Sequence, residues 1–206
     1  MRRLSKDIQS FYPFDWPFEE IVAELPDKGN LIEVGPYLGK STVTWAECFE
    51  RAGKEWNIHT IDLFIGISKI GRPDNPSEEL TKHLDSLLIS EELHEQTFKK
   101  NIEGWDNITY EKAYFNEDYQ PQQDYNVLWY DGLHDYEHVK EALEFWGEKV
   151  DEMIIDCYDE IHPGTVKAVD EYKYRPDGVH MIDHMRCILN PTPGKGIAWL
   201  LSLIHI

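Results

Sequence analysis

Short apolar runs recur along the chain, and most are followed by a longer stretch in which apolar positions return every three or four residues. A short run bounded by turn residues is typical of a buried strand, whereas the longer spacing is typical of a helix with one apolar face. The strands are expected at residues 30–34, 56–63, 107–112, 125–131, 153–155, 178–183 and 196–204. Five strand and helix units followed by two strands predict an open α/β sheet.

Two segments depart from this alternation. The leading segment, residues 1–28, is expected to hold one short helix that Asp15 caps and Pro26 ends. Residues 64–77 are rich in glycine and proline and too long for an ordinary connection, so we expect them to form a lid loop beside the substrate site. After this loop, Ser77 precedes a helical stretch that is predicted to reach from Glu78 to about Ile102.

The stretch NLIEVGPYLGKST, residues 30–42, joins the first strand to its helix through a turn that carries Gly35 and Gly39. Glycines let the backbone approach a ligand closely, and the amide groups at a helix start carry a partial positive charge. The turn therefore indicates a nucleotide-like ligand. The dinucleotide fingerprint would need glycine in place of Tyr37, and a Walker A loop needs one more residue before Gly39.

The turn does match E-x-G-x-x-x-G, which resembles the first motif of class I methyltransferases that use S-adenosylmethionine. Asp62, at the end of the second expected strand, extends the resemblance, because a carboxylate accepts two hydrogen bonds from a ribose diol and repels a phosphate. The resemblance implies that residues 1–206 form a single Rossmann-like domain with a mostly parallel seven-stranded sheet and an antiparallel C-terminal strand.

The same resemblance implies a set of cofactor-binding residues. Asp62 would hold the ribose, Tyr114 would stack on the adenine and Asp131 would lie near the sulfonium. The residues that would surround the methionine end and make the adjoining backbone contacts are Glu33, Gly35, Tyr37, Gly39 and Ser41.

A second motif, D-G-x-H-x-Y at residues 131–136, resembles a subset of class I methyltransferases related to cephalosporin hydroxylases and sugar O-methyltransferases. Residues 154–172 resemble the fifth strand and following helix of that subset, and the whole resemblance covers about residues 30–175. Cys157 stands where a second aspartate is more usual, which weakens the transfer of a metal site to this chain.

Methyl transfer to an oxygen requires the nucleophile to lose its proton as the new bond forms. The predicted catalytic residues are His134, Asp131 and Asp156. His134, with an unperturbed pKa near ~6.5, is placed to take the proton, and Asp131 to orient the ring. The alternative for His134 is a purely structural cap of the next helix. The expected acceptor is a small molecule with an oxygen nucleophile, of which a sugar is one candidate.

Whether a divalent cation takes part is left open by the sequence. In some methyltransferases of this fold an acid after strand four and a pair after strand five hold the ion, which here would be Asp131, Asp156 and either Cys157 or Asp159. Oxygen ligands alone suit magnesium or calcium, whereas a cysteine favours softer metals.

Three other functions compete. Residues 134–138 match H-x-x-E-H, the inverted signature of zinc proteases, although the motif opens a helix after a strand and does not lie within one. A P-loop phosphotransferase could use the turn at Gly35 with Asp131 holding magnesium, but Glu33 and Asp62 oppose a polyphosphate. The third is a binding subunit that holds S-adenosylmethionine and has lost catalysis.

The amino-acid composition limits the classes of partner that the chain is expected to bind. The formal net charge of −19 disfavours nucleic acids and anionic membranes, which are bound through clustered lysine and arginine. The three cysteines match no zinc or disulfide spacing, and neither a signal peptide nor an 18-residue apolar run is visible, so a cytoplasmic protein is expected. For the five aromatic residues at positions 11–18, three roles are left open: a cover over the ligand pocket, a seal on the core, or a homodimer contact.

Overall fold

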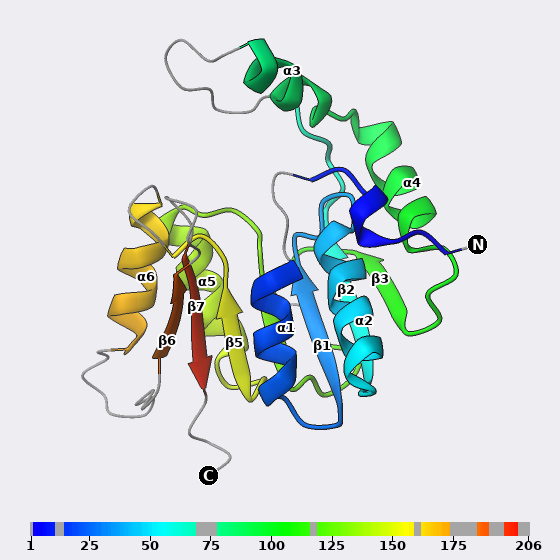
Figure 1. Ribbon diagram of the computed structural model, residues 1–206. Helices are drawn as coiled ribbons and strands as arrows, with labels where there is room; N and C mark the ends of the chain where they lie inside the picture. Colours follow the sequence, from blue (N-terminus) through cyan, green and yellow to red (C-terminus); the bar gives the residue numbers. More distant parts are fainter. Residues whose placement is uncertain are drawn as a thin grey trace.

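In a computed structural model the chain forms one central sheet with helices on both faces (Figure 1). The structure describes residues 2–10, 15–68, 78–115, 119–158, 162–173, 185–189 and 196–201. The strands are β1 Lys28–Val34, β2 Glu55–Asp62, β3 Ile108–Lys112, β4 Val127–Tyr130, β5 Glu152–Ile155, β6 Met185–Leu189 and β7 Gly196–Leu201. The helices are η1 Ser5–Asp7, α1 Asp15–Glu24, α2 Lys40–Ala52, α3 Glu78–Ser86, α4 Glu91–Ile102, α5 Tyr136–Trp146 and α6 Pro163–Lys173.

The strand order is β3-β2-β1-β4-β5-β7-β6. The first five strands are all parallel, whereas β7 runs antiparallel to both β5 and β6. Strand order reverses between β1 and β4, and in open α/β sheets ligands bind beyond the carboxyl ends of the strands at such a point. The predicted α/β fold with a parallel sheet is confirmed.

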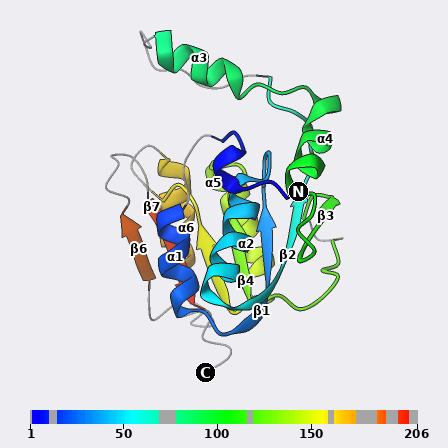
Figure 2. The same cartoon turned by 45° about the vertical axis from the view of Figure 1, so that its right-hand side comes forward.

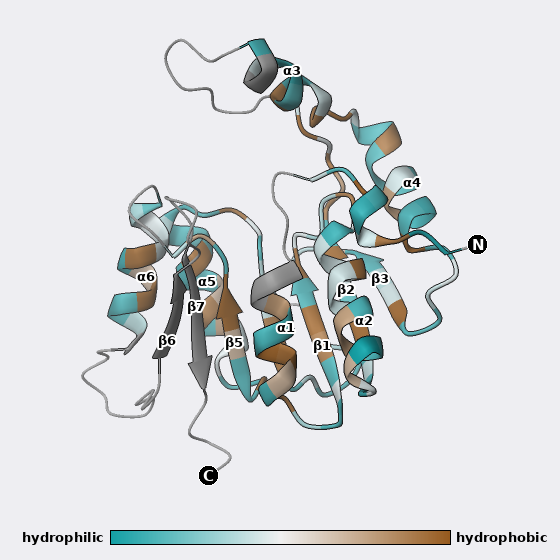
Figure 3. Cartoon of the chain, viewed as in Figure 1, coloured by the Kyte–Doolittle hydropathy of each residue, from teal (hydrophilic) through white to brown (hydrophobic). Residues whose placement is uncertain are grey.

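Each face of the sheet buries its own hydrophobic core. On one face, α1 and α2 cover β1 and β4, with Phe18 stacked on Trp45 at a centroid distance of 3.8 Å. On the other face, α5 and α6 pack together over β4 and β5 around the fully buried Trp146. Figure 3 shows a hydrophobic segment within each of β1 and β5, and neighbouring residues of these segments enter opposite cores: Leu31 and Ile154 the first, Ile32 and Ile155 the second.

Helix α3 extends away from the sheet, a feature visible in both ribbon views (Figures 1 and 2). The single helix predicted over residues 78–102 is wrong, because the structure has two helices there, α3 and α4. The chain breaks between α3 and α4 because the backbone of Ile89 exchanges hydrogen bonds with Ile67, at 2.8 and 3.1 Å. A residue paired in this way cannot also continue a helix.

Two other predicted elements, a C-terminal strand and the lid loop, fall wholly or partly outside the described residues. The strand expected at residues 178–183 lies outside the described residues, and β6 begins later, at Met185. Of the predicted lid, residues 69–77 also lie outside them, and only residues 64–68 can be placed. In the described parts of the chain, no helix combines the length and the apolar character needed to cross a bilayer.

Candidate active site

A cavity of about 450 Å³ opens at the carboxyl ends of the parallel strands. The strand register explains its position, because Val34 pairs with both Ile61 and Tyr130, and Tyr130 pairs with Ile155. The residues that follow these strand ends must therefore meet along one edge. Eight of the predicted site residues line the cavity: Gly35, Tyr37, Ser41, Asp62, Tyr114, Asp131, His134 and Asp156.

Gly35 is where the two sides of the cavity touch. Its φ of +83° lies in the left-handed region, and an added Cβ would stand 2.3 Å from the carbonyl oxygen of Asp131. Only glycine permits this approach of two backbones. Tyr37, at a φ of 50°, continues the turn and its hydroxyl donates a hydrogen bond to the carbonyl of Leu87. The turn is thus tied to the segment between α3 and α4, and α2 begins at Lys40, directly beyond Gly39.

Two residues predicted to surround the methionine end of the cofactor, Glu33 and Gly39, are not among those that line the cavity. Glu33 is fully buried, and its carboxyl oxygens accept hydrogen bonds from Ser41 Oγ and Thr42 Oγ1, both at 2.5 Å. Burial raises the pKa of Glu33 to about 7, and the two hydroxyl donors only partly offset it. Glu33 therefore fixes the first turn of α2 to β1.

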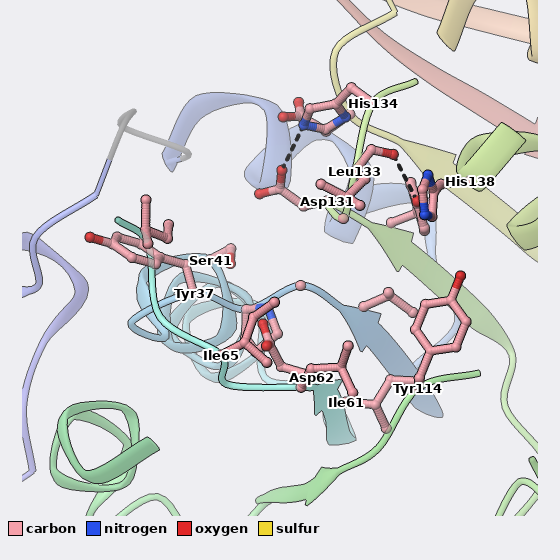
Figure 4. A pocket seen from close by; sticks show the side chains of 18 of the residues that line it. Tyr37, Ser41, Ile61, Asp62, Ile65, Tyr114, Asp131, Leu133, His134 and His138 are labelled. Carbon is pink, nitrogen blue, oxygen red and sulfur yellow. Dashed lines mark hydrogen bonds and ion pairs between the residues drawn. The ribbon is translucent and has the colours of Figure 1, made fainter. Parts of the chain in front are cut away.

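Asp62 ends β2 beside the turn, as predicted. One of its carboxyl oxygens, Oδ1, accepts a hydrogen bond from the backbone N–H of Phe64 at 2.5 Å. Burial raises the pKa of Asp62, while this bond and the nearby His94 and Lys112 act in the opposite direction. Figure 4 shows Asp62 on the same side of the cavity as Tyr37, Ser41 and Ile65.

Tyr114 follows β3 and lines the cavity from the far side of β2. Its ring stacks on Phe115 with centroids 5.0 Å apart, and its hydroxyl donates to Oε2 of Glu141 on α5 at 2.5 Å. Burial and the Glu141 carboxylate raise the pKa of Tyr114 to about 12, so the phenol stays neutral. The ring is held in place between the sheet and α5.

The loops after β4 and β5 supply the opposite wall. His134 Nε2 lies 3.6 Å from Oδ1 of Asp131, an ion pair when the imidazole is protonated (Figure 4). The His134 ring lies 5.2 Å from that of His162, which precedes α6. Asp156 and Cys157 are buried behind them, and both line the cavity.

His134 does not cap α5. The N-cap is Asp135, whose Oδ1 accepts a hydrogen bond from the backbone N–H of His138 at 3.3 Å, while Oδ2 contacts the His138 ring at 2.7 Å. Because α5 begins at Tyr136, His134 and His138 do not share one helix as zinc-protease ligands would.

The structure brings together a somewhat different set of possible metal ligands. Among the described residues, one group of at least three His, Cys, Asp or Glu side chains has its ligand atoms within 4.8 Å of one another, and it consists of His134, Asp156 and Cys157. Asp131 is not part of this group, and Asp159 lies outside the described residues.

Sequence reasoning missed His94, a buried residue of α4 that lines the cavity. Its Nδ1 accepts a hydrogen bond from the backbone N–H of Gly66 at 3.2 Å, so the proton of a neutral ring is on Nε2, which donates to the carbonyl of Tyr37 at 3.1 Å. His94 thereby joins the loops after β1 and β2. A histidine within a helix gives no sequence signal for such a role.

Comparison with known proteins agrees with this geometry. A family model described as a methyltransferase domain matches residues 32–155. Among solved structures, the O-methyltransferase NovP has a TM-score of 0.58 and 20% identity, over 90% of this chain and 78% of its own. No curated protein sequence matches significantly.

Two further solved structures contain the expected ligand or its product. TrmK of M. capricolum, in complex with S-adenosyl-homocysteine, has a TM-score of 0.53 and 11% identity, over 93% of this chain and 70% of its own. Magnesium protoporphyrin IX methyltransferase from Synechocystis PCC 6803, with bound S-adenosylmethionine, has a TM-score of 0.50 and 11% identity, over 91% and 79%. These structures share the fold, and the family model covers more than half of the sequence. The chain belongs to the methyltransferase domain family.

Proposed function

We infer that the chain transfers a methyl group from S-adenosylmethionine to an oxygen nucleophile on a small molecule. The observation that carries this proposal is that Gly35 and Asp62 line one cavity from the ends of adjacent, paired strands. The turn, which can accept the methionine end of the cofactor, thus lies beside a carboxylate that is suited to binding a ribose diol.

The cavity fits the cofactor in size and in chemistry. Its volume of about 450 Å³ lies within the range of ordinary small-molecule sites. The turn at Gly35 and the start of α2 would hold the methionine carboxylate, Asp62 the ribose hydroxyls, and Tyr114 the adenine. Asp62 disfavours a polyphosphate at the same place, which argues against a P-loop phosphotransferase.

The other wall would receive the acceptor. S-adenosylmethionine supplies an electrophilic methyl group on a sulfonium. His134 takes the proton from the acceptor hydroxyl, and Asp131, 3.6 Å away, orients the ring and stabilises its protonated form. The solved O-methyltransferase in the comparison is consistent with an oxygen nucleophile, but the choice of oxygen rests mainly on this histidine and aspartate pair.

Calorimetry with S-adenosylmethionine and with S-adenosylhomocysteine tests the cofactor site. We expect binding of one molecule per chain and a loss of at least tenfold in affinity for Asp62→Ala, because the ribose hydroxyls lose their acceptor. Asp106→Ala, an exposed aspartate between α4 and β3, is the matched control and should bind normally. Tight ATP binding without binding of either ligand would refute the proposal. Binding without transfer to any hydroxylated acceptor would identify a binding subunit.

A further inference from the structure

The loops after β4 and β5 bring together three side chains of different ligand chemistry. His134 offers a ring nitrogen, Asp156 a carboxylate oxygen and Cys157 a sulfur, and these ligand atoms all lie within 4.8 Å of one another. We propose that they form a binding site for a borderline-soft divalent cation such as Zn²⁺, at the acceptor side of the cavity.

The separation of the ligand atoms is close to what such an ion requires. Bonds of about 2.0–2.3 Å at tetrahedral angles place neighbouring ligand atoms roughly 3.3–3.8 Å apart. The most widely separated pair, at most 4.8 Å apart, would need to approach by roughly 1–1.5 Å, which side-chain rotation can supply. Cys157 Sγ already lies 3.3 Å from Oδ2 of Asp156.

The backbone at Cys157 supports the same conclusion. Its φ of 57° places a non-glycine residue in the left-handed region, at a cost of order 1 kcal/mol or more. In an extended strand, consecutive side chains point to opposite faces. The left-handed turn instead brings the thiol beside the preceding carboxylate, where both line the cavity. Such strain is retained where a site needs the resulting geometry.

The ligand set selects the metal. Magnesium and calcium take oxygen ligands almost exclusively, whereas zinc combines sulfur, nitrogen and oxygen. Three protein ligands would leave a fourth position, and because all three residues line the cavity, water or an acceptor oxygen could reach it. Metal-bound histidines usually donate their other ring N–H to a carboxylate, which orients the ring. Asp131, 3.6 Å from Nε2 of His134, is placed for this role.

Metal binding changes the task of His134. While one nitrogen of His134 holds the ion it cannot take a proton, so in a loaded site Asp131 would be the proton acceptor, and the ion would supply Lewis-acid chemistry that lowers the pKa of a hydroxyl. The metal site shares His134 with the proposed methyl transfer, but metal binding can be measured without turnover, so the two inferences are tested separately.

Cobalt serves as the probe, because a thiolate bound to Co²⁺ gives a charge-transfer band in the near ultraviolet. We expect one Co²⁺ per chain with this band, displaced by Zn²⁺ but not by a large excess of Mg²⁺. Cys157→Ser should remove the band and weaken binding at least tenfold, and His134→Ala should weaken binding to a similar extent. Cys48→Ala changes a buried cysteine of the α2 core and should leave the spectrum unchanged.

Cys157→Asp offers oxygen in place of sulfur and should lose the band while gaining affinity for Mg²⁺. A band that persists in Cys157→Ser, or the absence of stoichiometric cobalt in the native chain, would overturn the site. Calorimetry with S-adenosylmethionine on each variant reports folding separately. Cofactor binding without metal refutes only this inference, and metal binding without cofactor refutes only the proposed function.

Discussion

The two walls of the cavity differ in how their polar groups are used. On the side of β1 and β2, the groups that line the cavity are bound to the protein itself: Tyr37 to Leu87, Asp62 to Phe64, and His94 to both loops. On the side of β4 and β5, the contacts run among the groups of the wall, from Cys157 to Asp156 and from His134 to Asp131, and the ligand atoms of His134, Asp156 and Cys157 lie within 4.8 Å of one another. The first wall is a fixed shape that can recognise a cofactor, whereas the second gathers groups that can react.

The largest expected effect is on the reactive wall. His134→Ala should reduce turnover by about 10²- to 10⁴-fold, because proton removal from the acceptor then has no assistance. Formation of S-adenosylhomocysteine over a panel of hydroxylated small molecules measures it. Cofactor affinity should stay within about twofold, because the first wall is untouched. His83→Ala, an exposed histidine of α3, is the control. Equal turnover in both variants would remove His134 from the reaction.

The contact between the walls can be broken at Gly35. Gly35→Ala should cost about 3–5 kcal/mol of unfolding free energy, because the new Cβ meets the Asp131 carbonyl at 2.3 Å and the residue remains at a positive φ. Gly53→Ala shares the positive φ, but nothing lies within 4 Å of its added Cβ, so it should cost only about 1 kcal/mol. Urea unfolding of both variants separates the cost of the steric clash at the added Cβ from the cost of holding alanine at a positive φ. Equal losses would show that the two backbones are not in tight contact.

The buried carboxylate of Glu33, which fixes α2 to β1 beside the first wall, should make the stability of the fold depend on pH. The pKa of Glu33 is raised from 4.5 to about 7 in the fold, so the folded chain holds this proton more tightly than the unfolded chain. The free energy of unfolding should therefore fall, by up to roughly 3 kcal/mol, as pH rises from 4.5 through 7. In Glu33→Gln this part of the pH dependence should vanish, while the exposed control Glu103→Gln retains it. Parallel pH profiles for both variants would contradict the assignment.

The smallest expected effect concerns the support of the reactive wall. Asp135→Ala removes the N-cap of α5 and should cost about 1 kcal/mol near neutral pH. The His138 hydrogen bond lowers the pKa of Asp135, so the contribution of this carboxylate is lost as pH falls and it becomes protonated. Thermal unfolding at neutral and acid pH, with Asp124→Ala as the exposed control, measures the difference. A cost that does not shrink in acid would mean that the charge of Asp135 is not involved.

The strand ends were predictable because a buried strand and its flanking turn leave a strong pattern, and parallel pairing then brings Gly35, Asp62, Asp131 and Asp156 to one edge. The orientation of Glu33 was not predictable, since the motif does not say whether the carboxylate faces a ligand or the hydroxyls of Ser41 and Thr42.

Two other features depend on contacts between distant parts of the chain. The break between α3 and α4 requires the pairing of Ile89 with Ile67, which no local helix pattern contains. The meeting of His134 with Cys157 requires a left-handed backbone at a cysteine, a conformation that side-chain type does not predict.

The direct contact of the Gly35 and Asp131 backbones also limits how the two walls can move. With no side chain between them, the walls have no intervening layer in which to slide or compress at that point. In the proposed methyl transfer, the distance between donor and acceptor is then set by how each ligand is bound, so acceptors that differ by a single bond length in reach should differ sharply in rate.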